Sequence, residues 1–108
     1  MKQILFHLKQ SNIEITIEAY FNDEKLIIEG YDIGESVTEA WGDSDYEYSM
    51  TLLPESVQQV YSLFNTPIDS KEELLKAIAA KYNHNKCYSQ LMELFNQHKI
   101  KFDAASWT

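Results

Sequence analysis

The chain has 108 residues, the length of one ordinary domain, and 44% of them are hydrophobic, so a packed core is expected. Its net charge is −8, from 17 acidic and 9 basic residues. This excess of negative charge argues against binding to nucleic acid or anionic lipid and favours a basic protein partner. We therefore expect a single domain spanning residues 1–108.

The first ten residues, MKQILFHLKQ, contain an apolar run that His7 and Lys9 interrupt. Such a run is too short for a secretory signal or a membrane span. Cys87 is the single cysteine, so no disulfide can form within the chain. These features predict a cytoplasmic protein without membrane contact.

The first part of the chain has the alternation of apolar and polar residues that is typical of strands. Residues 4–9 and 13–20 alternate in this way, with Ile4, Phe6 and Leu8 expected on one face. Residues 26–31 form the next strand, and Gly34-Glu35-Ser36 then breaks the chain before a short segment that ends at Trp41. The pattern predicts an antiparallel arrangement with turns between the strands.

A fourth strand follows the turn-forming residues Gly42-Asp43-Ser44. Asp45 and Glu47 share one parity with Ser49 and Thr51, whereas Tyr46 and Tyr48 share the other parity with Met50 and Leu52. Because alternate side chains of a strand point to opposite faces, both tyrosines are expected in the core, with their hydroxyls bonded to polar partners. Asp45 and Glu47 are expected on the opposite face.

The rest of the chain has helical periodicity. Pro54 is a favoured first helical residue, and apolar residues then recur at helical spacing up to Phe64. Ser70 and Glu73 have the spacing of a capping box at the start of a second helix, and a third helix runs through Leu91. Alternation returns after residue 100 and predicts a short closing strand ending at Trp107.

Strands followed by helices predict an α+β fold, in which an antiparallel meander of four to five strands precedes about three helices packed on one face. The other face then carries Glu14, Glu18, Asp45 and Glu47. Residues 10–55 hold twelve acidic residues and one basic residue, Lys25. We therefore expect an acidic sheet face that is open to solvent.

No motif with established catalytic chemistry is found. Asp43, Asp45 and Glu47 have the spacing of early calcium ligands, but Tyr48 and Pro54 stand where a calcium loop needs Gly and Glu. His84 and Cys87 lie three residues apart, yet a zinc site needs two more ligands that the sequence does not place, so they are interpreted as a loop histidine and a half-buried cysteine. We expect a protein that is not an enzyme and has no cofactor, metal or catalytic residue.

Residues 41–48, WGDSDYEY, and the ending with Phe102 and Ser106-Trp107 resemble a set of small bacterial proteins of unknown function. The resemblance extends over nearly the whole chain and implies a stand-alone bacterial domain. In size, charge and architecture the chain also resembles, more loosely, the immunity proteins that neutralise basic toxins.

Our first hypothesis is an interaction protein, such as an inhibitor or immunity protein, whose acidic face binds a basic partner. Glu14, Glu18, Asp45 and Glu47 would steer the partner, and Tyr20, Tyr31 or Trp41 would supply an apolar anchor. Trp41 and Trp107 could both anchor a partner, but packing in the core or at its edge is the favoured role for them. Two alternatives stay open: a subunit that self-associates as a homodimer, and a small hydrolase that uses carboxylates of the same face or a metal.

Overall fold

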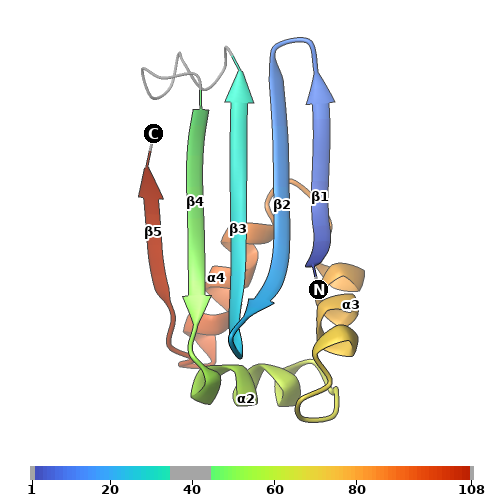
Figure 1. The fold of residues 1–108 in the computed structure, drawn as a ribbon, viewed down its shortest axis with the longest axis vertical. Coiled ribbons are helices and arrows are strands. Elements are labelled where there is room, and N and C mark those ends of the chain that lie inside the picture. Colours follow the sequence, from blue (N-terminus) through green and yellow to red (C-terminus); the bar gives the residue numbers. More distant parts are fainter. Residues whose placement is uncertain (1, 35–44, 108) are drawn as a thin grey trace.

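The computed structural model describes residues 2–34 and 45–107, which form a five-stranded antiparallel sheet and three helices (Figure 1). The strands lie side by side in chain order: β1 (Lys2–Gln10), β2 (Ile13–Asn22), β3 (Lys25–Gly34), β4 (Asp45–Leu52) and β5 (Asp103–Trp107). The helices are α2 (Pro54–Leu63), α3 (Lys71–Lys81) and α4 (Cys87–Gln97). The predicted α+β meander, with helices on one face and a closing strand, is confirmed.

The pairing of the strands sorts the side chains onto two faces. Ile17, Gly30 and Tyr48 lie opposite one another across β2, β3 and β4, and this row faces the helices. The parity assigned to Tyr46 and Tyr48 is thus confirmed. We call the other side the open face, because no described helix covers it (Figure 1). The open face carries Lys2, Ile4, His7, Lys9, Glu14, Thr16, Glu18, Tyr20, Ile27, Glu29, Tyr31, Ile33, Asp45, Glu47, Ser49, Thr51, Asp103 and Ala105.

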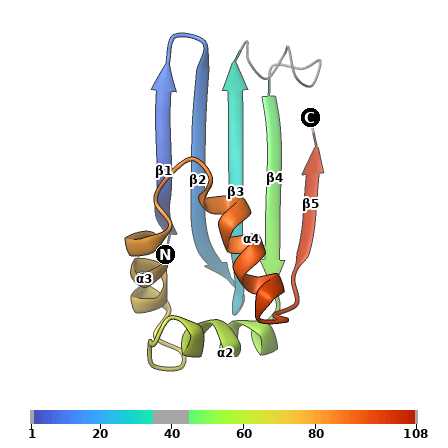
Figure 2. The ribbon, with the colours of Figure 1, turned by 180° about the vertical axis from the view of Figure 1, so that it is seen from behind.

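The core lies between the sheet and the apolar stripes of the helices. Figure 2 shows α3 and α4 against this face, with α2 crossing the lower ends of the strands. The upper ends of the strands extend beyond the helices. No described helix is long and apolar enough to cross a membrane. Fully buried side chains come from every layer and include Ile28, Met50, Val60, Leu74, Ile78, Leu91 and Phe95.

A β-bulge in β1 changes the prediction for Ile4. The pairing with β2 shifts by one residue between Ile4 and Phe6, so Ile4 does not share the face of Phe6 and Leu8. Ile4 is 55% exposed on the open face, whereas Leu5 is buried in the core. A bulge adds one residue to one strand, and a simple alternation of apolar residues does not reveal it.

The helices α2 and α3 begin where the sequence predicts, but one predicted capping contact is absent. Pro54 is the first residue of α2, as predicted, and Ser70 is the residue that precedes α3. The capping box proposed at Ser70 is wrong, because its side chain makes no cap hydrogen bond. Its ψ of 72° departs from the extended backbone that N-cap residues typically adopt. The Ser70 carbonyl instead accepts the first helical hydrogen bond, from the Leu74 amide at 2.9 Å.

Candidate binding site on the open face

The fold brings the four predicted acidic residues to the same face. Glu14 and Glu18 lie on β2, and Asp45 and Glu47 lie on β4. Since β3 runs between these strands, the two pairs are separated by roughly 10 Å. Trp41, the fifth predicted site residue, lies outside the described residues, and so does Asp43. The side chain of Trp107 lies outside them as well.

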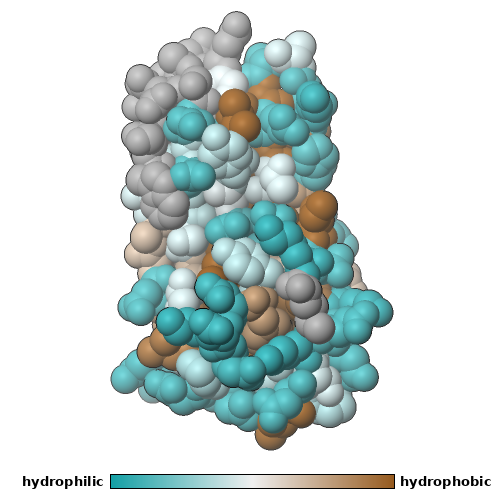
Figure 3. Space-filling model, in the orientation of Figure 1, coloured by the Kyte–Doolittle hydropathy of each residue, from teal (hydrophilic) through white to brown (hydrophobic). Residues whose placement is uncertain are grey.

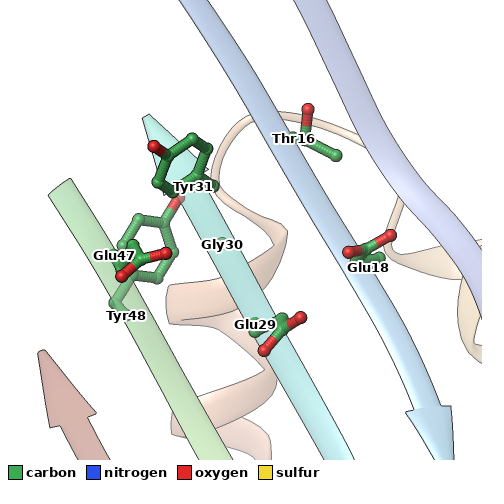
Figure 4. A pocket seen from close by; sticks show the side chains of 7 residues that line it. All are labelled: Thr16, Glu18, Glu29, Gly30, Tyr31, Glu47 and Tyr48. Carbon is green, nitrogen blue, oxygen red and sulfur yellow. The ribbon is translucent and has the colours of Figure 1, made fainter. Parts of the chain in front are cut away.

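A hollow of about 340 Å³ lies on the open face over the middle of β3 (Figure 4). One side is the row formed by Thr16, Tyr31 and Glu47, which lie opposite one another on three strands. The other side is the cross-strand pair Glu18 and Glu29. These five side chains surround a floor formed by Gly30, with the Tyr48 ring behind the sheet (Figure 4).

The floor of the hollow is supported from the helix side by Tyr48. A Cβ atom added to Gly30 would lie 2.1 Å from the Tyr48 ring, so the ring packs directly against the glycine backbone. The Tyr48 hydroxyl donates a hydrogen bond to Asp32 Oδ1 at 3.0 Å. Its ring also meets Tyr88 of α4 edge-on, with 4.7 Å between the ring centroids. These contacts hold the floor in one position.

The electrostatics of the hollow are dominated by carboxylates. Glu18 and Glu29 lie directly opposite each other on neighbouring strands, an arrangement of like charges that destabilises a sheet. Lys2 Nζ lies 3.3 Å from Glu18 Oε1 and offsets part of this repulsion. Among the described residues, no cation forms an ion pair with Glu29 or Glu47. The hollow is therefore an acidic surface that is only partly neutralised.

Hydroxyl groups supply the other polar contacts of this face. Tyr20 donates a hydrogen bond to Glu29 Oε2 at 3.1 Å, and Tyr31 donates one to Asp45 Oδ2 at 3.1 Å. Burial, followed by the nearby charge of Glu29, raises the pKa of Tyr20 above its usual value, so this phenol stays protonated as a donor. Asp45 lies at one margin of the hollow rather than within its lining.

Glu14 lies outside the hollow. Its Oε2 is 3.7 Å from His7 Nε2, and His7 Nδ1 lies 3.1 Å from Thr16 Oγ1. The structure thus gathers Glu18 and Glu47 at the hollow and leaves Glu14 and Asp45 beside it. Figure 3 shows this face in the same view as Figure 1, largely hydrophilic with isolated hydrophobic residues.

Sequence reasoning missed Glu29, which completes the acidic lining. The strand LIIEGY, residues 26–31, has apolar side chains on both parities, so alternation does not indicate which face Glu29 occupies. The pairing with Glu18 settles its face. Gly30 beside it is the signal that the sequence offers, because a glycine within a strand often marks a close approach of another group, here the Tyr48 ring.

The helix-side groups are not suited to nucleophilic chemistry. Burial raises the pKa of the Cys87 thiol, which keeps it protonated near neutral pH and therefore a poor nucleophile. Burial also raises the pKa of Tyr88 to about 12. Among the described residues, no three His, Cys, Asp or Glu side chains are placed to hold a metal ion. The open-face hollow instead offers separated acceptor oxygens, an arrangement suited to a group with several N–H donors.

No protein-family model, curated protein or solved structure matches this chain. The geometry and charge of the described residues are therefore what indicates a function.

Proposed function

We propose that the protein is a non-enzymatic interaction domain that binds a basic protein partner through its open face. The observation that carries this proposal is the hollow bounded by Glu18, Glu29 and Glu47. The two glutamates of its cross-strand pair repel each other, and a cationic group placed between them would relieve the repulsion. An inhibitor or immunity protein that covers the surface of a basic toxin is the concrete form of this function.

An arginine or lysine side chain of the partner fits the lining of the hollow. Carboxylates and hydroxyls accept hydrogen bonds from guanidinium or ammonium groups, and charge-assisted bonds of this kind are among the stronger ones. Glu14 and Asp45 at the margins would add long-range attraction, which raises the association rate more than the affinity. Tyr31, whose ring borders the hollow, would contribute apolar contact.

The test uses a fluorescently labelled octa-arginine peptide as a probe of cation binding. Fluorescence anisotropy compares the parent with a triple variant, Glu18→Gln, Glu29→Gln and Glu47→Gln, at about 0.05 M and 0.15 M salt. We expect the affinity of the triple variant to be at least tenfold lower, since three charge-assisted contacts are removed. The parent affinity should fall as salt rises, because screening shortens the range of the attraction.

A matched control removes the same number of charges elsewhere. Asp69→Asn, Glu73→Gln and Glu93→Gln change three exposed acidic residues outside the open face and give the same net charge. This control should keep most of the parent affinity. Equal losses in the two triple variants would mean that the peptide responds to net charge alone, and the proposed binding site would be rejected.

A further inference from the structure

A second hollow lies where two segments distant in sequence come together. The start of α2 lies beside the connection between α4 and β5 in both ribbon views (Figures 1 and 2). The hollow between them measures about 390 Å³ and shares no lining residue with the open-face hollow. This volume is at the lower end of the range of small-molecule sites, roughly 300 to 1,000 Å³.

The wall of this hollow contains the hydroxyl group of a largely buried serine. Ser56 is 5% exposed and lines the hollow from the first turn of α2. Its hydroxyl forms no hydrogen bond with any of the described residues. Every fully enclosed side-chain polar atom among these residues has a partner, so the Ser56 hydroxyl is not fully enclosed. The Ser56 hydroxyl therefore retains access to the hollow and is available to a ligand there.

Four charged side chains of both signs line the same hollow. Lys99 and Lys101 come from the connection that follows α4, Glu55 from α2 and Asp103 from the start of β5. Within the described part of the chain, none of the four takes part in an ion pair. Opposite charges that share a hollow without pairing can each bind the complementary group of a ligand.

The hollow also has an apolar part. Leu53, between β4 and α2, is 41% exposed, and Phe102 is half-buried. Both side chains line the hollow. A ligand with an apolar portion would cover this surface and exclude water from it, and such burial is favourable in proportion to the apolar area.

We propose that this hollow binds a small zwitterion with an apolar side chain, such as a free amino acid. Its carboxylate would accept hydrogen bonds from Lys99, Lys101 and the Ser56 hydroxyl, and its ammonium group would face Glu55 and Asp103. A simple anion would meet two carboxylates in this hollow, and a simple cation would meet two lysines. A ligand that carries both charges satisfies all four side chains. The inference does not rest on cation binding in the open-face hollow, which has a different lining.

The first experiment separates the two charges of the ligand. Amide NMR spectra of the full chain are recorded during titration with L-phenylalanine, N-acetyl-L-phenylalanine or L-phenylalanine amide, at constant pH and ionic strength. L-Phenylalanine should give saturable shifts at residues 53–57 and 99–103, and each derivative should bind at least tenfold more weakly. If N-acetyl-L-phenylalanine binds as tightly as L-phenylalanine, the hollow is an anion site. If L-phenylalanine gives no saturable shift, the hollow does not bind it. Either result overturns the proposal.

The second experiment tests the lining residues. Lys99→Gln with Lys101→Gln should lower the affinity for L-phenylalanine at least tenfold, and Ser56→Ala should lower it about threefold. Asp103→Asn tests the ammonium side separately and should also weaken binding. The matched control, Lys81→Gln with Lys86→Gln, changes two exposed lysines that do not line the hollow and should bind as the parent does. Equal affinities in the two double variants would overturn the assignment.

Discussion

At the residue scale, Tyr48 connects the interior of the protein with the floor of the open-face hollow. Its ring packs against Gly30, its hydroxyl bonds to Asp32, and its edge meets Tyr88. Burial strongly raises the pKa of the Tyr48 hydroxyl, with the nearby charge of Asp32 as the next cause, so the phenol stays a hydrogen-bond donor. Its replacement would therefore affect both the core and the hollow.

The contact between Gly30 and Tyr48 gives the first prediction. Gly30→Ala should lower the free energy of unfolding by about 2 kcal/mol, because the added Cβ would displace the ring from its contacts with Asp32 and Tyr88. In a Tyr48→Ala background the same change should have a much smaller effect. Urea denaturation of the four proteins measures this coupling. Additive effects would show that the ring does not limit the space at Gly30.

Asp32 gives a prediction for the pH dependence of stability. Burial raises its pKa in the folded state, and the hydrogen bond from Tyr48 opposes the rise. The charged form therefore destabilises the fold at neutral pH, and this penalty decreases as pH falls through the folded pKa. Below the unfolded value near 3.8 it disappears. Asp32→Asn should thus be more stable than the parent at pH 7, and the difference should vanish near pH 3.

The measurement is a series of thermal melts between pH 3 and pH 7. Asn retains an oxygen that can accept the Tyr48 hydrogen bond, so the variant removes the charge and can keep this contact. Asp45→Asn is a suitable comparison, because Asp45 also accepts a tyrosine hydrogen bond but lies on the open face. If the melting temperatures of the parent and the Asp32→Asn variant differ by the same amount at every pH, this account is contradicted.

At the element scale, the helix starts differ in what their first residues provide. Leu53 precedes α2 with an extended backbone, at ψ 162°, but its side chain cannot accept a hydrogen bond. Ser70 precedes α3 with a hydroxyl, but its ψ is 72° and no cap bond forms. Ser70 therefore has a side chain suited to capping but an unsuitable backbone conformation, and Leu53 has the reverse.

This difference predicts opposite responses to substitution. Leu53→Ser should raise the free energy of unfolding by roughly 0.5 to 1 kcal/mol, since a serine there can accept a hydrogen bond from a first-turn amide. Ser70→Ala should change it by only a few tenths of a kcal/mol, because no cap bond is lost. Chemical denaturation measures both. A loss near 1 kcal/mol for Ser70→Ala would indicate that the hydroxyl does cap α3 in solution.

Most of the elements were predictable because their patterns are local. Alternation located β2 and β4, and the stripes through Val60, Ile78 and Leu91 located the helices. The β1 bulge, the face of Glu29 and the hollow depend on pairing between strands, which a single strand does not encode. The four predicted acidic residues thus lie on the face that alternation indicates, whereas the position of Glu29 beside them follows only from the pairing between strands.

At the scale of the whole molecule, negative charge is concentrated in the first half of the sequence. Residues 56–108, which include most of α2, all of α3 and α4 and the closing strand β5, carry five acidic and six basic residues, whereas twelve acidic residues lie within residues 10–55. Carboxylates held close together on a surface repel one another, and this repulsion weakens as salt screens it. The free protein should therefore become more stable as the salt concentration rises.

Glu29→Gln gives the last prediction, because Glu29 faces Glu18 across the strands and forms no ion pair with the described residues. Removing its charge should stabilise the free protein by roughly 0.2 to 1 kcal/mol at low salt, with little effect at 1 M salt. Glu93→Gln, an exposed change on α4, should show neither effect. Denaturation midpoints at the two salt concentrations measure this.

The same substitution should weaken binding of the octa-arginine probe, so stability and binding should change in opposite directions. If the acidic face served only solubility, we would not expect stability and probe binding to change in opposite directions, because the repulsion between Glu18 and Glu29 would not be relieved by a partner. If Glu29→Gln stabilises the protein and leaves binding intact, the glutamate pair is not part of the contact surface. If it destabilises the protein at low salt, the hydrogen bond from Tyr20 to Glu29 outweighs the repulsion between the two carboxylates.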